Sequence, residues 1–180
     1  SRAHREIIHL ARLLRRLSVF VGGWTLEAAQ EVVGDAWLVV GGLHQLANKS
    51  LLLVEETESG DPRYRLLESP RAYALERLEA GGERAAMQRR HALAIADAFD
   101  ATYDDYFSGR VGVDAWMRQR ESDFDNARDA LHWARREGEV EVELRVGATL
   151  LRALPASLHA ERMALASACE ARLDRPLPEP

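Results

Sequence analysis

The apolar positions of the first 48 residues recur every three or four residues, which is the spacing of amphipathic helices. They predict three helices, over 4–17, from about 27 to 33 and from about 36 to 48. Thr25 stands where an N-cap residue precedes the second helix, and Gly34–Asp35 interrupts the pattern before the third. The third segment, AWLVVGGLHQLAN, is so rich in apolar residues that we expect burial on more than one side.

After Ser50 the pattern changes from helix to strand. Two short apolar runs, 51–56 and 63–67, flank the polar segment TESGDP, which contains glycine and proline. This arrangement predicts a β-hairpin with a fairly long loop. Ser69 and Pro70 then match the N-cap and first residue of a further helix that runs to about Glu79. Three helices followed by a hairpin predict a winged helix, that is, a helix-turn-helix with two appended strands.

Beyond Gly81–Gly82 every pattern is helical. We expect helices over 83–107, 113–137, 139–154 and 158–173, with glycine or proline at several of the breaks. Short breaks between helices predict antiparallel neighbours, as in a helical bundle or an α-solenoid. The fold class is therefore mainly α, with one domain at 1–80 and a second at 83–175. We expect no regular structure in the tail RPLPEP.

The composition is that of a globular protein, with 47% apolar and 29% charged residues among 180. No apolar run approaches the ~20 residues that cross a bilayer, so we expect no membrane segment. The only cysteine is Cys169, which excludes an internal disulfide and favours a cytoplasmic location. The first residue is Ser1, so we expect the chain to be part of a longer protein.

No catalytic motif emerges from the sequence. A phosphate-binding P-loop needs glycines directly before a Lys-Ser or Lys-Thr pair, and Lys49-Ser50 follows Ala47-Asn48 instead. The six histidines are scattered without a second ligand at helical spacing, which argues against a metal site. We therefore expect no enzymatic activity, cofactor or metal in this chain.

The predicted winged helix raises the question of DNA binding. The third helix should enter the major groove, yet it contains neither arginine nor lysine. The loop TESGDP is acidic, and the net charge of −5 lacks the basic balance of a nucleic-acid module. If DNA does bind, the candidates for phosphate contacts are Arg12, Arg15, Arg16 and Lys49. These features argue against direct DNA binding.

Four stretches together resemble one family. They are LLRRLSVFVGGWTLEAAQEVVG, LHQLANKSLLLVEE, PRYRLLESPRAYALERLEAGGE and WMRQRESDFDNARDALHWARREGEVEVELRV. They are similar to bacterial signal-transduction ATPases of the STAND class and to the ATPase regions of SARP-type and LuxR-type transcriptional regulators. In that family an ATPase domain is followed by a winged helix and then by a tetratricopeptide-like (TPR-like) array.

The resemblance implies that ATP or ADP binds to an upstream domain and that the winged helix packs on it. Relatives carry a nucleotide-sensing histidine just after the hairpin, and that position is Leu67 here, which cannot hydrogen-bond a phosphate. Glu68 and Arg71 are the neighbouring polar candidates for that interface. The helical array would bind an unknown protein or small-molecule effector. Its most recognisable residues are Asp125, Asn126 and Trp133, and we expect Asn126 and Trp133 to be structural.

The sequence leaves three hypotheses. The first is a non-catalytic regulatory part of an ATP-dependent transcriptional regulator, with its winged helix on the upstream ATPase domain. The second is a DNA-binding winged-helix transcription factor. The third is a helical scaffold for protein interactions. The uncharged third helix and the acidic loop favour the first hypothesis over the second.

Overall fold

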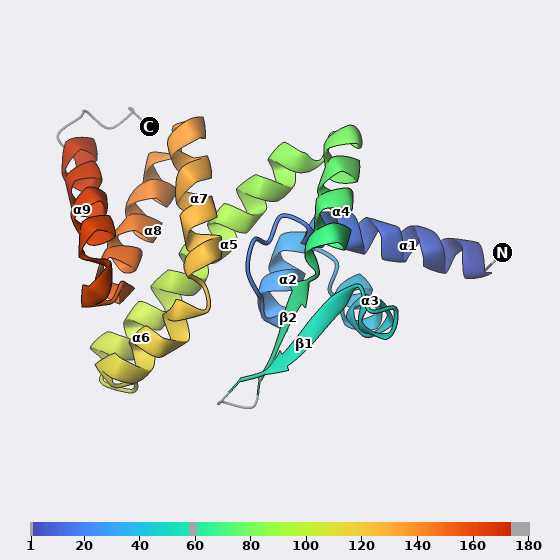
Figure 1. The fold of residues 1–180 in the computed structure, drawn as a ribbon, viewed down its shortest axis with the longest axis horizontal. Helices are drawn as coiled ribbons and strands as arrows, with labels where there is room; N and C mark the ends of the chain where they lie inside the picture. The colour runs from blue at the N-terminus through green and yellow to red at the C-terminus, as the bar shows by residue number, and fades with distance from the viewer. Residues whose placement is uncertain (1, 58–60, 174–180) are drawn as a thin grey trace. The chain divides into compact units, whose positions relative to one another are not determined.

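The computed structural model describes residues 2–57 and 61–173 (Figure 1). It divides into two compact units, Ser1–Ala94 and Ile95–Pro180. The elements are α1 (Arg2–Leu17), α2 (Leu26–Val33), α3 (Ala36–Asn48), β1 (Leu52–Glu56), β2 (Pro62–Leu66), α4 (Glu68–Ala80), α5 (Arg84–Phe107), α6 (Val113–Glu121), α7 (Phe124–Glu137), α8 (Val140–Ala153) and α9 (His159–Leu173). The prediction of a mainly α chain with an N-terminal winged helix is confirmed.

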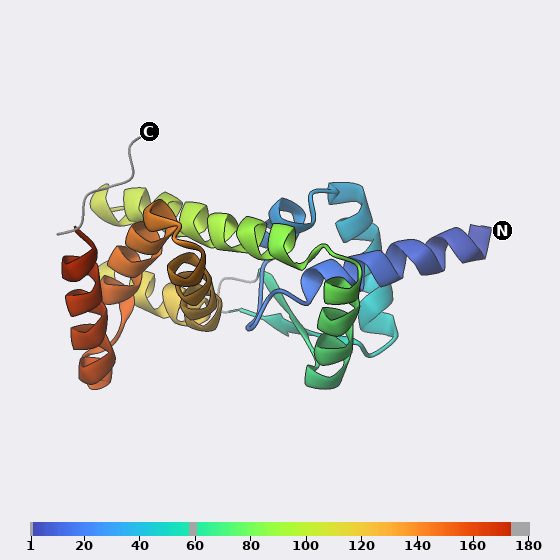
Figure 2. The same cartoon turned by 90° about the horizontal axis from the view of Figure 1, so that it is seen from above.

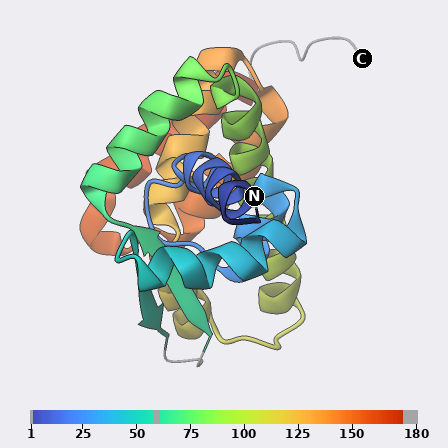
Figure 3. The same ribbon diagram turned by 90° about the vertical axis from the view of Figure 1, so that its right-hand side faces the viewer.

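The core of the first unit is built where α1, α2 and α3 meet. Leu13 and Leu17 of α1 are fully buried against residues of the other two helices, such as Val33 and Leu46. In Figure 3, which views α1 nearly along its axis, α3 crosses close to it. Gly42 allows this approach, because a Cβ at that position would overlap the Cδ2 atom of Leu13.

The two strands form the antiparallel hairpin that the sequence predicts. Leu52 pairs with Leu66 and Glu56 pairs with Pro62, so the register is set from end to end. Trp24 extends this small sheet, since its backbone N–H and C=O both bond to Tyr64 at 2.9 Å. The indole ring of Trp24 is buried in the core beside the hairpin.

Helix α4 begins earlier than predicted. Its N-cap is Leu67 and its first residue is Glu68, so Ser69 and Pro70 lie inside the first turn. The backbone N–H of Leu67 donates to Leu51 O at 3.3 Å, which ends the hairpin directly before the helix. Pro70 fits there because the N–H groups of a first helical turn have no intrahelical acceptor.

The beginning of α5 completes the core of the first unit. Met87 is buried in that core, and the ring of His91 packs edge-on against Phe20 with 5.0 Å between the ring centroids. The compact unit therefore extends to Ala94, past the turn at Gly81–Gly82. The proposed domain limits 1–80 and 83–175 remain a prediction, because compactness does not test independent folding.

The second unit is helical throughout the described residues, and α8 lies between α7 and α9 (Figures 1 and 2). The predicted helix 113–137 is in fact two helices, and this prediction was wrong. The backbone N–H of Asp123 bonds to Arg120 O at 2.9 Å, and the Arg120 and Asp123 side chains pair at 3.3 Å across the break. The local Ser122–Asp123 turn thus ends α6 and starts α7.

Trp133 and Asn126 are buried on α7, which agrees with their expected structural role. Arg145 of α8 joins the second half of α5 through ion pairs with Asp97 at 2.5 Å and Asp100 at 2.6 Å. The expectation for the tail RPLPEP lies outside the described residues. No helix in the described ranges is both long and apolar enough to span a bilayer.

Candidate nucleic-acid interface

Local sequence signals hold the helix-turn-helix in shape. The Thr25 side chain caps α2 by accepting the Ala28 N–H at 3.3 Å, and the Asp35 carboxylate caps α3 by accepting the Leu38 N–H at 3.0 Å. Between the helices, Gly34 adopts a left-handed φ of 73° and bonds to Gln30 O. Glycine adopts this conformation without the steric cost that a Cβ imposes.

Two arginines from outside the turn fix the end of α2. Arg16 Nη1 donates to Val33 O at 3.0 Å, while its Nε and Nη2 bond to Glu83 at 2.9 and 2.6 Å. Arg90 Nη2 donates to Glu31 O at 2.6 Å. Both carbonyls belong to the last turn of α2, where the helix dipole favours positive charge. No local sequence signal indicates these long-range bonds.

The outward face of α3 is the surface that a DNA-reading helix would present. One side of α3 is buried through Val39, Leu43 and Leu46, so the expected burial on more than one side is wrong within this chain. Ala36 is exposed at the start of the helix, and the other exposed residues recur at helical spacing: Trp37, Val40, Gly41, His44, Gln45 and Asn48. The face is therefore apolar at the start of α3 and polar toward its end.

Trp37 is the residue that sequence reasoning missed. Its side chain is 90% exposed, although tryptophan is a residue that folding normally buries to a large extent. Val40, one turn further along the helix, is 53% exposed. Because α3 is apolar on several sides, its sequence alone did not separate the buried side from the exposed one.

The four candidates for phosphate contacts differ in availability. Arg12 on α1 and Lys49 at the end of α3 are exposed. Arg16 is held by Glu83 and Val33, and its side chain is only 14% exposed. Arg15 is half-buried, and its Nε is buried with no hydrogen-bond partner among the described residues. The arrangement thus leaves Arg12 and Lys49 as the accessible cations of this set.

The hairpin contributes little positive charge of its own. Arg63 donates to Gly23 O at 2.8 Å, and Arg65 lies 4.0 Å from the exposed carboxylate of Glu55. Glu56, the last residue of β1, and Asp61, which directly precedes β2, are exposed acidic residues. Glu58, the other acidic residue of the segment TESGDP, lies outside the described residues.

The three candidates for an interface with another domain lie where the hairpin meets α4. Leu67 is 37% exposed, and Glu68 beside it is exposed in the first turn of α4. Arg71 is half-buried, and its Nε donates to Phe20 O at 2.6 Å. Arg71 therefore has a structural bond, whereas Leu67 and Glu68 are available at the surface. In the described ranges no group of three His, Cys, Asp or Glu residues is placed to hold a metal ion.

Comparisons with known proteins agree with this geometry. Residues 9–79 match the family model described as "Winged helix-turn-helix domain". The chain is 34% identical over 144 residues to the Mycobacterium tuberculosis protein "Putative HTH-type transcriptional regulator Rv0890c", and equally similar to a Mycobacterium bovis protein with the same kind of name. A second Mycobacterium tuberculosis protein, named only as uncharacterized, is 39% identical over 84 residues, which is 44% of this chain and 21% of that protein.

The matched region covers 77% of this chain but only 16% of the two HTH-type regulators. No solved structure is significantly similar to the chain. The geometry of α1 to β2 and the family match lead to the same conclusion: residues 9–79 form a winged helix-turn-helix domain, within a chain homologous to mycobacterial proteins named as HTH-type transcriptional regulators.

Proposed function

We propose that this chain is part of a bacterial transcription regulator and that its winged helix contacts DNA through the exposed face of α3. The observation that carries the proposal is the winged helix-turn-helix at residues 9–79, with the outward face of α3 exposed in the described chain. The names of the relatives support the same class of function. We also propose a cytoplasmic location and no catalytic site in this chain.

The polar half of α3 is the part suited to base contacts. Gln45 and Asn48 present amides, which can bond to adenine in the major groove, and His44 lies on the same face. Arg12 and Lys49 are the accessible cations of the predicted set. Few phosphate contacts imply that affinity depends weakly on salt. The logarithm of the binding constant should fall with the logarithm of the salt concentration at a slope of roughly −2, rather than the −6 to −10 of strongly basic modules.

Fluorescence anisotropy of a labelled random duplex tests this proposal directly. We expect binding at about 50 mM salt that weakens modestly at about 200 mM salt. A variant with Gln45→Ala and Asn48→Ala should lose most of the binding, whereas the matched variant Gln30→Ala on α2 should keep it. Absence of binding at low salt, or equal binding by the two variants, would refute DNA contact through α3.

A second candidate function is docking on another domain of the same protein, as in nucleotide-dependent regulators. Two specific observations favour it: Trp37 is 90% exposed and Val40 is 53% exposed at the start of α3. Exposed aromatic residues are typical of interfaces between proteins rather than of phosphate contacts. In this case ATP or ADP would bind in the other domain, and Leu67 and Glu68 would extend the interface.

The two candidates place their important residues on different halves of α3. Under docking, Trp37→Ala should weaken association with a separately produced nucleotide-binding domain of the parent protein, measured by calorimetry with ADP present. The Gln45→Ala and Asn48→Ala variant should then associate normally. If Trp37→Ala leaves association unchanged, the docking role of α3 is excluded.

For the second unit we propose that the helices from α6 to α9 form a TPR-like array that binds a protein or small-molecule effector. The support is the succession of helices with short connections and the packing of α8 between α7 and α9. The same features suit the third hypothesis, a plain scaffold. Measured binding of an effector that changes the DNA affinity of the parent protein would favour the regulatory role.

A further inference from the structure

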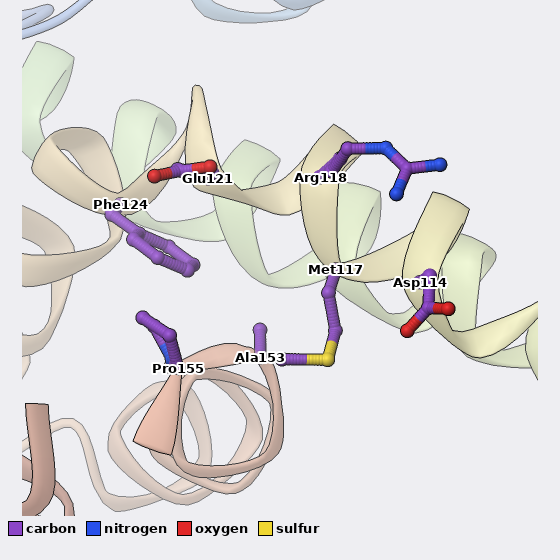
Figure 4. Close-up of a pocket in the computed structure, with 7 residues that line it drawn as sticks. All are labelled: Asp114, Met117, Arg118, Glu121, Phe124, Ala153 and Pro155. Carbon is purple, nitrogen blue, oxygen red and sulfur yellow. The ribbon is translucent and has the colours of Figure 1, made fainter. Parts of the chain in front are cut away.

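A pocket of about 230 Å³ opens in the second unit between α6 and the end of α8 (Figure 4). Its apolar part is formed by Met117, Phe124, Ala153 and Pro155. In Figure 4 the Phe124 ring and the Met117 side chain reach from above toward Ala153 and Pro155 below. A dry cavity of roughly 150 Å³ accepts a benzene molecule, so this pocket has room for one leucine, methionine or phenylalanine side chain.

Three charged residues surround the apolar part, and all three come from one face of α6. Asp114, Arg118 and Glu121 follow the spacing i, i+4 and i+7. Among the residues that the structure describes, the side chains of these three have no hydrogen-bond or ion-pair partner. Two carboxylates against one guanidinium give this rim a net negative charge.

Several other charged residues of the unit are paired within the described part of the chain. Arg128 binds Glu161 at 2.7 Å, and Arg135 binds Glu143 at 3.0 Å. Ile95–Pro180 contains 11 basic and 17 acidic side chains, a net charge of −6. An acidic surface attracts a basic partner over distances of about a Debye length and thereby speeds association.

We propose that this pocket binds a protein segment that inserts one large apolar side chain and carries basic residues on either side of it. The apolar residues take the inserted side chain, while Asp114 and Glu121 pair with the flanking basic residues. Arg118 orients the segment by donating hydrogen bonds to a backbone carbonyl or a carboxylate of the segment. This assignment is independent of whether the winged helix contacts DNA.

The methionines of the chain provide a specific probe. Only Met87, Met117 and Met163 are present, so a sample labelled with ¹³C at the methionine methyl groups has three signals. Met117 lines the pocket, whereas Met87 is buried in the first unit and Met163 is exposed on α9. The probe ligand is a capped nonapeptide with leucine at its centre and two arginines on each side, titrated into the full chain.

We expect the Met117 signal to shift saturably in the millimolar range while the Met87 and Met163 signals stay in place. Replacing the central leucine by alanine should weaken binding at least about tenfold, because a buried leucine contributes about 1.5–3 kcal/mol. Replacing the arginines by glutamates should abolish it. The proposal would be overturned if the Met117 signal did not shift on addition of the arginine peptide, or if it shifted equally with the glutamate peptide.

Charge variants of the protein complete the test. The double variant Asp114→Asn with Glu121→Gln should weaken binding of the arginine peptide by about two- to thirtyfold, since each of the two exposed ion pairs contributes about 0.2–1 kcal/mol. The matched control, Asp104→Asn with Glu170→Gln, removes the same charge from the unit but lies outside the pocket. If both double variants weaken peptide binding equally, the pocket rim has no specific role in binding. If the Met117 signal shifts with protein concentration alone, the occupant of the pocket is a second copy of the chain.

Discussion

Gly41 and Gly42 are neighbours on α3, yet alanine should have opposite effects at the two positions. A Cβ on Gly41 meets no atom within 4 Å, whereas a Cβ on Gly42 would overlap the Cδ2 atom of Leu13. Alanine at either site gains about 0.8–1 kcal/mol of helix propensity relative to glycine. Gly41→Ala should therefore raise the free energy of unfolding by up to about 1 kcal/mol.

At Gly42 the same gain is opposed by overpacking. Leu13 is fully buried and Leu10 Cδ1 lies 3.8 Å from the added Cβ, so α1 has little room to adjust. An extra methyl group in a packed core costs about 1–3 kcal/mol. Because helix propensity is common to both variants, the difference between their free energies of unfolding isolates this cost, and we expect Gly42→Ala to be less stable than Gly41→Ala by about 1–3 kcal/mol.

Urea titration followed by the methyl signal of Met87 measures this difference, because Met87 is buried in the core of the first unit. Leu13→Ala provides the cross-check. On its own, Leu13→Ala should lower the free energy of unfolding by about 2–5 kcal/mol. Because it also removes the overlapping methyl group, Gly42→Ala should not lower the free energy of unfolding further when Leu13 is already alanine. Equal stability of the two glycine variants, or additive effects of Leu13→Ala and Gly42→Ala, would refute the close approach of α1 and α3.

Three further predictions concern single contacts. Gly34→Ala should lower the free energy of unfolding by about 1–2 kcal/mol in a urea titration, because alanine is strained at a φ of 73° and its Cβ would overlap the Arg90 guanidinium. The hydrogen bond from Arg128 lowers the pKa of Glu161, so this pair should stabilise the protein above the ordinary carboxyl pKa and lose that effect as the pH falls through the lowered value. Glu161→Gln should therefore cost less than about 1 kcal/mol near pH 7, since the pair is partly exposed, and the difference from the original chain should vanish in acid. Trp133→Ala should cost about 3–5 kcal/mol by thermal denaturation, and a cost under about 1 kcal/mol would show that Trp133 is not part of the core.

Most of the fold was predictable because its signals are local. Thr25, Gly34 and Asp35 mark the helix-turn-helix through capping and turn chemistry, and the structure uses each of them in that way. The hairpin was equally accessible from two short apolar runs around a polar loop. The start of α4 was missed because Leu67 has no side chain that caps a helix, and only its bond to Leu51 sets the boundary.

The candidate interface was less accessible to sequence reasoning. Arg16 counted as a possible phosphate contact, but its bonds to Glu83 and Val33 join residues that are far apart in the chain. The exposure of Trp37 depends on which side of α3 meets α1, and an apolar helix does not specify this on its own. Long-range packing thus decided which residues are available at the surface.

The hydrogen bonds from Arg16 and Arg90 to the end of α2 have a practical consequence for fragment design. The family match ends at residue 79, yet Glu83, which orients Arg16, and Arg90, which binds Glu31 O, both lie beyond it. A fragment cut at the matched boundary would expose the core that Met87 covers and would release the last turn of α2. Residues up to Ala94 therefore belong in any attempt to isolate the winged helix, and a failure of a shorter piece to fold or to bind would say nothing about the intact domain.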